Sequence, residues 1–236
     1  MSAETLVILP TFNERDNLER VVAAVRGLGH DVLVVDDNSP DGTGEVADPL
    51  AAADPHVSVL HRAGKLGLGS AYVAAFKLGL GRDYRFLVEM DADGSHRIEH
   101  LPAIIEAAHA NGGLGLGSRY VAGGGVAGAW GAHRKFLSWG ANVYCRALLG
   151  LNVHDCTSGY RCYTRGLLEA IGLDRVISDG YSFQIEMVYL TTLKGYRVTE
   201  VPILFEDRIA GASKVTRGEI VSDFLSVIRL RLRHGR

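Results

Sequence analysis

Residues 86–95 read Phe-Leu-Val-Glu-Met-Asp-Ala-Asp-Gly-Ser, an apolar run that ends in two carboxylates one residue apart. The run lacks polar alternation, which is typical of a parallel strand buried between helix layers. Ligands of open α/β sheets bind beyond the carboxyl ends of the strands, so we expect Asp91 and Asp93 at a ligand site. Paired carboxylates repel one another, and a hard cation such as Mg²⁺ or Mn²⁺ offsets this repulsion. Because Mg²⁺ usually keeps positions for water and phosphate oxygens, the pattern predicts a diphosphate as the second ligand.

The dipeptide spacing by itself fits a second interpretation equally well. Asp residues often cap the following helix or form a solvated turn. The rest of the chain has to decide between a metal site and a turn.

Apolar runs alternate with amphipathic helical patterns through the first half of the chain. We expect strands at residues 5–9, 32–35, 57–60, 86–90 and 114–117. This βαβ alternation predicts an α/β fold with a mostly parallel sheet flanked by helices and joined by right-handed crossovers. A late strand is expected at residues 197–205.

Composition excludes several classes of protein. The 236 residues suit one domain, and 47% hydrophobic with 22% charged residues is ordinary for a chain with a packed core. A net charge of −2 provides no field for nucleic acid. Three cysteines without a CxxC pair argue against a disulfide framework and suit the cytoplasm. We see neither a signal peptide nor the run of about 18 apolar residues that a spanning helix needs.

Two helices in the second half are expected to be amphipathic. Residues 133–151 and 220–232 carry apolar side chains at helical spacing, with basic residues on the remaining positions. Each helix fits either a core element with a charged outer face or a helix lying on a membrane surface. A Gly-rich loop at 123–128 separates a half at about 1–120 from a half at about 121–236.

Five stretches together resemble the polyprenol-phosphate (dolichol-phosphate) mannose synthases, within family 2 of the GT-A glycosyltransferases. They are Leu9–Glu14 (LPTFNE), Val34–Thr43 (VVDDNSPDGT), Met90–His96 (MDADGSH), Gly117–Val121 (GSRYV) and Gly180–Met187 (GYSFQIEM). Residues 155–163 and 207–214 also resemble this family, so the match covers nearly the whole chain. The resemblance implies a single GT-A domain, with a nucleotide-sugar-binding first half and an acceptor-side second half.

The resemblance implies an inverting, metal-dependent transfer of mannose from GDP-mannose to a polyprenyl phosphate at the cytoplasmic membrane face. By position, guanine and ribose would be held by Pro10, Phe12, Glu14, Val35 and Asp37. Asp91, Ala92 and Asp93 would meet the diphosphate and its Mg²⁺ or Mn²⁺, with Ser95 near the coordination shell. Arg119, Arg208 and Lys214 would bind phosphates.

Three departures from the family pattern are visible. Phe12 stands where a Tyr is common, Gly94 replaces a larger apolar residue, and Ser95 stands where some members carry a glutamine ligand. Some family members carry additional C-terminal transmembrane helices, whereas this sequence stops short of them. Membrane attachment is therefore expected to come from amphipathic helices or from a partner subunit.

The expected chemistry needs no general base. A phosphate monoester has a second pKa of about 6 and is mostly a dianion at pH 7, hence already a nucleophile. Catalysis then rests on positioning and on charge stabilisation, for which we expect Asp93, Arg119 and Arg134, the last near the acceptor phosphate. A hexosyl transferase using a UDP-sugar, such as a glucosyl transferase, is the alternative.

Overall fold

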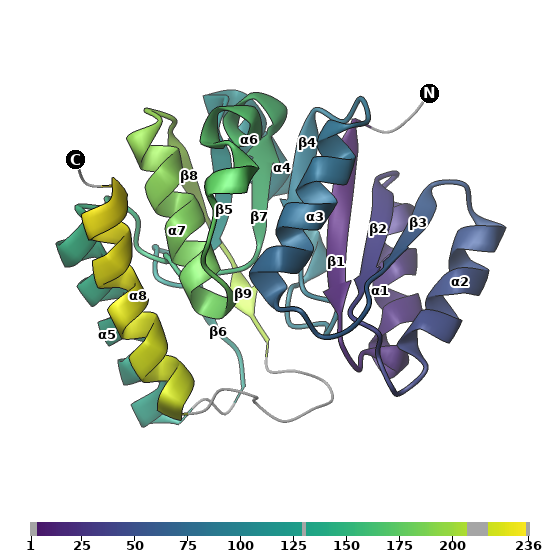
Figure 1. Cartoon of the computed structure of the whole chain (residues 1–236), viewed down its shortest axis with the longest axis horizontal. Coiled ribbons are helices and arrows are strands. Elements are labelled where there is room, and N and C mark those ends of the chain that lie inside the picture. Colours follow the sequence, from purple (N-terminus) through teal and green to yellow (C-terminus); the bar gives the residue numbers. More distant parts are fainter. Residues whose placement is uncertain (1–3, 129–130, 207–216, 235–236) are drawn as a thin grey trace.

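A mostly parallel sheet forms the centre of the computed structural model, which describes residues 4–128, 131–206 and 217–234. Its strand order is β3-β2-β1-β4-β7-β5-β8 (Figure 1). The strands are β1 (Thr5–Thr11), β2 (Asp31–Asp36), β3 (Val57–His61), β4 (Phe86–Glu89), β5 (Leu114–Ser118), β7 (Arg161–Thr164) and β8 (Val198–Pro202). Neighbouring strands are parallel except at β7, which runs antiparallel to both β4 and β5. The predicted mostly parallel α/β fold is confirmed.

Helices cover both faces of this sheet (Figure 1). One layer holds α1 (Arg15–Gly27), α2 (Thr43–Ala53) and α4 (Leu101–Asn111), and the other holds α3 (Leu68–Leu80), α6 (Arg165–Ile171) and α7 (Gly180–Leu193). In β1, the Val7 side chain packs against the first helix layer, and those of Leu6 and Ile8 pack against the second. Both faces of the strand are therefore apolar, which explains the missing polar alternation in the sequence.

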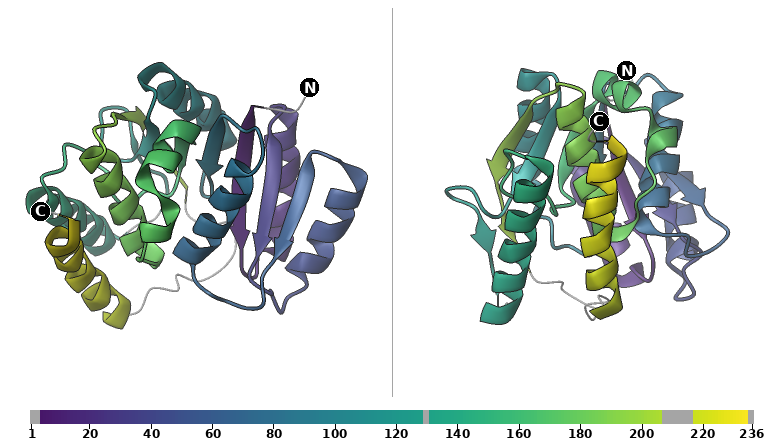
Figure 2. Two further views of the ribbon diagram at one scale, coloured as in Figure 1. Left: turned by 45° about the horizontal axis from the view of Figure 1, so that its top comes forward. Right: turned by 60° about the vertical axis from the view of Figure 1, so that its left-hand side comes forward.

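Two further helices lie together at one end of the molecule. Figure 2 shows α5 (Ala132–Leu149) beside α8 (Arg217–His234), and the two are in contact. They agree with the helices predicted at 133–151 and 220–232. Among the described helices, no segment is both long and apolar enough to span a membrane.

The strand expected at residues 197–205 is divided in the structure. It splits into β8 and β9 (Leu204–Phe205), with buried Ile203 between them. β9 leaves the main sheet and pairs with β6 (Gly125–Val126). Two short 3₁₀ helices, η1 (Ile98–His100) and η2 (Leu173–Arg175), complete the described elements.

The two halves of the sequence share one sheet. β7 comes from the second half and lies between β4 and β5, which come from the first. The boundary near residue 120 is therefore no break in the sheet, and the division into a donor half and an acceptor half stays a prediction.

Candidate active site

The Asp91-Ala92-Asp93 turn leaves the carboxyl end of β4, as the sequence predicts. Its backbone is held on both sides. Asp93 Oδ1 accepts a hydrogen bond from the Ser95 amide at 2.9 Å, and the Asp91 amide donates to His96 Nδ1 at 3.0 Å. Gly94 completes the turn at φ 79°, in the left-handed region that favours glycine. The Asp93 residue is 3% exposed, whereas the Asp91 side chain is 34% exposed.

His96 supports this turn, a role that the sequence analysis did not assign. Its ring stacks on Tyr160 with centroids 4.6 Å apart, and burial lowers the pKa of His96 to about 4. The ring is therefore neutral at pH 7, and an unprotonated Nδ1 can accept from the Asp91 amide. Its Nε2 lies 3.8 Å from Asp91 Oδ2. A buried aromatic pair thus fixes the backbone that carries the first carboxylate.

The residues of this turn fit a divalent cation shared with a substrate. The described residues hold no group of three His, Cys, Asp or Glu side chains arranged for a metal ion. Two carboxylates fit Mg²⁺ or Mn²⁺ when water and phosphate oxygens complete the coordination. Ser95 Oγ is buried and has no hydrogen-bond partner among the described residues, so an additional oxygen ligand is available.

The residues expected around guanine and ribose lie at the carboxyl ends of β1 and β2, two strands that pair in parallel. Asp37 is bound by Arg62 Nη1 at 2.5 Å and by the Leu66 amide at 3.2 Å. Lys65 Nζ lies 4.7 Å from the centre of the Phe12 ring. The segment after β3 therefore forms a basic edge of this region. This basic edge was not predicted from the sequence, although the clustering of Arg62 and Lys65 just beyond a strand was a usable signal.

The other residues expected around the nucleotide differ in which of their groups a ligand could reach. Val35 is fully buried in the core, so only its backbone could meet a ligand. Glu14 donates its amide to Thr43 Oγ1 at 3.0 Å and accepts from Asn17 Nδ2 at 3.1 Å. Pro10 lies in β1 and is partly exposed.

The Arg119 side chain is bound by a carboxylate of the same chain, that of Asp155. Its Nε and Nη2 each donate to the Asp155 carboxylate at 2.7 Å, and its backbone amide donates to Asp155 Oδ2 at 3.0 Å. Burial alone would raise the pKa of Asp155, but the charge and hydrogen bonds of Arg119 outweigh it and hold this pKa below its usual value. The predicted phosphate-binding role of Arg119 stays a prediction, and this geometry assigns the side chain a structural role.

Two buried ionisable residues lie beneath the candidate metal turn. Glu89 of β4 stands directly opposite Arg161 of β7, and both are fully buried. Burial raises the pKa of Glu89 to about 7, against the opposing effect of the Arg161 charge. Arg161 donates to the carbonyl oxygens of Ser158, Cys156 and Gln184 at 2.6–2.8 Å. It therefore joins the segment before β7 to α7.

Three of the expected cations fall outside what the structure describes. Arg208 and Lys214 belong to residues 207–216, which are not described. Arg134 lies in the first turn of α5, where the backbone alone is described. Their expected roles stay predictions.

Comparisons with known proteins agree with this architecture. Residues 6–172 match the family model described as Glycosyl transferase family 2. The chain is 51% identical over 219 residues to polyprenol monophosphomannose synthase of Mycolicibacterium smegmatis, covering 92% of this chain and 82% of the relative. It is 48% identical over 226 residues to undecaprenyl-phosphate mannosyltransferase of Micrococcus luteus, covering 95% and 92%.

Solved structures share the fold at low sequence identity. Glucosyl-3-phosphoglycerate synthase from Mycobacterium tuberculosis superposes with a TM-score of 0.62 at 19% identity, covering 98% of this chain and 79% of the other. A mannosyltransferase from Pyrobaculum calidifontis, in complex with GDP-Man and Mn²⁺, gives 0.55 at 17% identity, covering 99% and 71%. A family model that matches residues 6–172 and two relatives near half identity over most of their length establish one conclusion: the chain belongs to glycosyl transferase family 2.

Proposed function

We propose that this enzyme transfers mannose from GDP-mannose to a polyprenyl monophosphate, with inversion at the anomeric carbon and with Mg²⁺ or Mn²⁺ as cofactor. One observation carries the proposal: Asp91 and Asp93 follow β4 at the sheet edge where Asp37 follows β2. Only β1 separates these two strands, so they run about 10 Å apart in the sheet. One nucleoside diphosphate sugar can extend between the two sites. The names of the two relatives support the sugar and the acceptor, and the GDP-Man complex supports the donor.

The nucleoside end of the donor lies over the ends of β1 and β2. Pro10, Phe12 and Glu14 line it from β1 and the residues that follow, while Asp37 and the backbone of Val35 line it from β2. Phe12 offers a ring face to the base. Its neighbour Lys65 adds a positive charge at this nucleoside end of the site.

The diphosphate end lies over the turn after β4. Asp91 and Asp93 would hold the cation, and Ser95 Oγ is the candidate for a further oxygen ligand. Ala92 packs its side chain in the core, so only its backbone could meet the diphosphate. A bound divalent cation supplies Lewis-acid stabilisation of the leaving diphosphate. His96 keeps the Asp91 backbone fixed, so both carboxylates hold their positions as charge builds on the leaving group.

The acceptor needs positioning rather than activation, because its phosphate is mostly a dianion at pH 7. In the proposed step, an acceptor phosphate oxygen forms a bond to the anomeric carbon as the bond from that carbon to GDP breaks. Two polyanions must approach each other, and cations between them lower the repulsion. We assign this role to Arg134, Arg208 and Lys214, with Arg119 held in place by Asp155.

Transfer to lipid tests the proposal directly. The purified chain is incubated with Mg²⁺ or Mn²⁺, a short polyprenyl phosphate, and labelled GDP-mannose, GDP-glucose or UDP-glucose in parallel. Organic-extractable label from GDP-mannose alone is the expected result. Label from UDP-glucose alone would show that UDP-glucose, and not GDP-mannose, is the donor. If the chain binds the donor but no label is extracted, either the proposed acceptor is wrong or a membrane subunit is required.

A matched pair of variants tests the metal assignment. Asp93→Asn removes one buried charge at the carboxyl end of β4 and is expected to abolish both transfer and Mn²⁺ binding while the protein stays folded. Asp83→Asn makes the same change at an exposed position before the amino end of β4 and should leave both unchanged. Near-normal turnover of folded Asp93→Asn would exclude the assignment.

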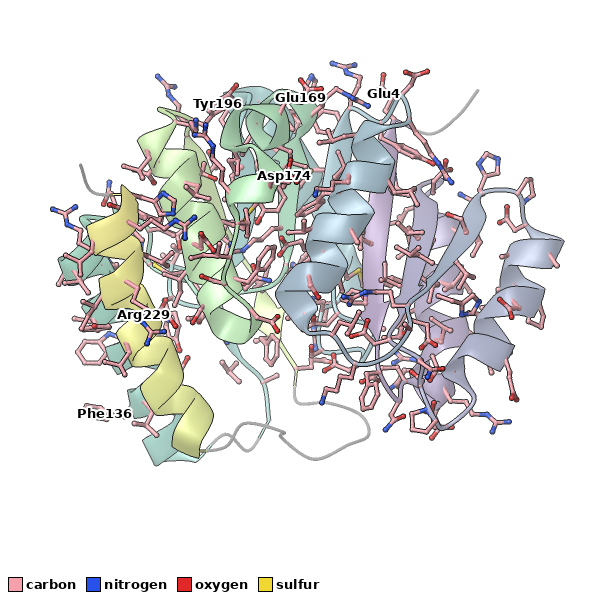
Figure 3. The ribbon with its side chains drawn as sticks, in the orientation of Figure 1. Glu4, Phe136, Glu169, Asp174, Tyr196 and Arg229 are labelled. Carbon is pink, nitrogen blue, oxygen red and sulfur yellow. The ribbon has the colours of Figure 1, made fainter. Side chains whose placement is uncertain are left out.

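The enzyme is proposed to work as a peripheral protein on the cytoplasmic membrane face. α5 exposes Phe136, Leu137, Trp139 and Val143, and the neighbouring α8 exposes Leu225, Ile228 and Leu232. The exposed fractions reach 67% for Phe136 and 71% for Leu232. Figure 3 shows Phe136 and Arg229 on these two neighbouring helices. An apolar surface with Arg229, Arg231 and Arg233 beside it suits an anionic bilayer.

Vesicle sedimentation distinguishes a bilayer from a partner subunit as the anchor. We expect binding to vesicles with anionic lipid, weaker binding to neutral vesicles, and loss of binding for Trp139→Ser. Leu28→Ser removes an exposed apolar side chain at the end of α1 and serves as the control. Full activity with no vesicle binding would transfer the anchoring role to a partner subunit.

A further inference from the structure

One carboxylate, that of Asp179, joins two helices far apart in the sequence. It is the N-cap of α7, where Oδ1 accepts from the Gly180 amide at 2.8 Å. The same Oδ1 accepts from the Gly69 amide in the first turn of α3 at 2.6 Å. Both amides belong to helix N-termini, where unsatisfied donors and the helix dipole favour a negative charge. Asp179 therefore satisfies donors of both helices at once.

The contact between this carboxylate and α3 is close. Gly67 precedes the helix at φ 99°, and a Cβ added there would lie 1.7 Å from Asp179 Oδ2. A Cβ at Gly69 would lie 2.5 Å from the carbonyl oxygen of Ser178. The first turn of α3 thus rests directly on residues 178–179, and glycine is required at both contact points.

Residues 177–179 are in turn fixed from behind. The fully buried carboxylate of Glu186 accepts from the Ile177 amide at 3.1 Å and from the Ser178 amide at 2.8 Å. The segment that carries Asp179 is therefore anchored to the body of α7. This makes it a firm support for the start of α3.

The first turn of α3 holds the basic segment beside Asp37. Arg62 donates from Nη2 to Ser70 Oγ at 2.5 Å and from Nη1 to the Gly67 carbonyl at 3.2 Å. The same Nη1 donates to Asp37 Oδ1, and the Leu66 amide donates to Asp37 Oδ2. Both of these hydrogen bonds of Arg62 are thus made to the turn that Asp179 caps.

We propose that Asp179 is a positioning residue for nucleotide binding, acting from the second half of the sequence on the proposed nucleoside site. By capping the first turn of α3, it holds residues 62–67 in the position that orients Asp37. This inference rests on the proposed function, because Asp37 is assigned there to the nucleoside. Asp179 itself lies two contacts away from Asp37 and is not proposed to touch the nucleotide.

GDP binding in the presence of Mn²⁺, measured by calorimetry on the full chain, tests the proposal without turnover. Loss of one helix cap corresponds to roughly a five- to ten-fold change in an equilibrium constant, so Asp179→Ala should raise the Kd for GDP by about this factor. Asp179→Asn keeps a capping oxygen and should restore most of the affinity. In steady-state assays, KM for the donor should rise while kcat and KM for the acceptor stay close to wild type.

Asp174→Ala is the matched control. Asp174, labelled in Figure 3, also joins α3 to a later segment, through Lys77 Nζ at 2.5 Å, but at the far end of the helix. This variant should bind GDP as wild type does. A GDP affinity of Asp179→Ala equal to that of Asp174→Ala would refute the positioning role.

Two further measurements keep failure of this inference separate from failure of the proposed function. If the wild-type chain binds no GDP, or if Asp37→Ala binds it normally, the proposed nucleotide site is wrong. If Asp179→Ala does not fold, Asp179→Ser retains a cap for α7 with a side chain one atom shorter. Hydrogen exchange of residues 62–70 in that variant should then be faster than in wild type, and unchanged exchange would refute the proposal.

Discussion

Replacing Asp155 by alanine tests a buried ion pair of the described structure, the one between Asp155 and Arg119. The Asp155 side chain is fully buried and that of Arg119 is 8% exposed, so neither group is screened by water. Three N–H groups of Arg119 donate to this carboxylate, at 2.7, 2.7 and 3.0 Å. The alanine variant leaves a desolvated guanidinium without its counter-charge.

The expected loss follows from this burial. Removing one partner of a buried ion pair costs about 3–5 kcal/mol, because the remaining charge is uncompensated. An exposed pair would contribute only about 0–1 kcal/mol. For a chain of this length, the expected loss corresponds to a fall in Tm of roughly 6–20 °C.

Urea unfolding at pH 7 and at lower pH provides the assay. The folded-state pKa of Asp155 is lowered by Arg119, which outweighs burial, so its stabilisation is complete above the unfolded pKa of about 3.9. It is lost as the pH falls through the lower folded pKa. The difference between wild type and Asp155→Ala should therefore be constant near neutral pH and shrink below about pH 4.

A double-mutant cycle with Arg119→Ala isolates the pair. The double variant should be less destabilised than the sum of the single variants, with a coupling energy of about 2–3 kcal/mol. A loss below about 1 kcal/mol for Asp155→Ala, or additive single variants, would show that this contact behaves as a surface pair and would refute the reasoning.

Three other changes have definite expected outcomes. Burial raises the pKa of Glu89 to about 7, so ionisation of this carboxyl opposes folding. As the pH rises from 5 to 8 in the absence of metal, Glu89→Gln should therefore become more stable than wild type, by on the order of 3 kcal/mol. Urea unfolding at several pH values measures this difference. A Cβ at Gly115 would lie 2.1 Å from the Ile104 carbonyl oxygen, so Gly115→Ala should lower the free energy of unfolding by about 3 kcal/mol or more. A Cβ at Gly140 on α5 would lie in open space, so Gly140→Ala should raise the free energy of unfolding by up to about 1 kcal/mol. Burial raises the pKa of the Cys156 thiol to about 12, so a thiol reagent at pH 8 should label it only after denaturant is added; rapid labelling of native protein would contradict its burial.

Much of the site was predictable because its chemistry is local in the sequence. Apolar runs without polar alternation predicted buried strands, and strand ends of a parallel sheet collect polar residues at one edge. Asp91 and Asp93 were assigned on that basis, whereas Asp37 was assigned from the family resemblance, and the structure places the three residues after β4 and β2. The helices at 133–151 and 220–232 were likewise predicted from their periodicity alone.

Contacts between distant residues were decided by the tertiary structure. Periodicity cannot show that β7 enters the sheet antiparallel between β4 and β5, because strand order depends on packing between elements. The pairing of Arg119 with Asp155, 36 residues further along the chain, was not predicted, and the expected phosphate-binding role of Arg119 stays a prediction. Asp179 caps a helix 110 residues away, and no local pattern records such a contact. The sequence alone predicted the fold class and the position of Asp91 and Asp93 just after a buried strand, whereas only the folded chain decided which charges pair with one another, because pairing depends on distances in space.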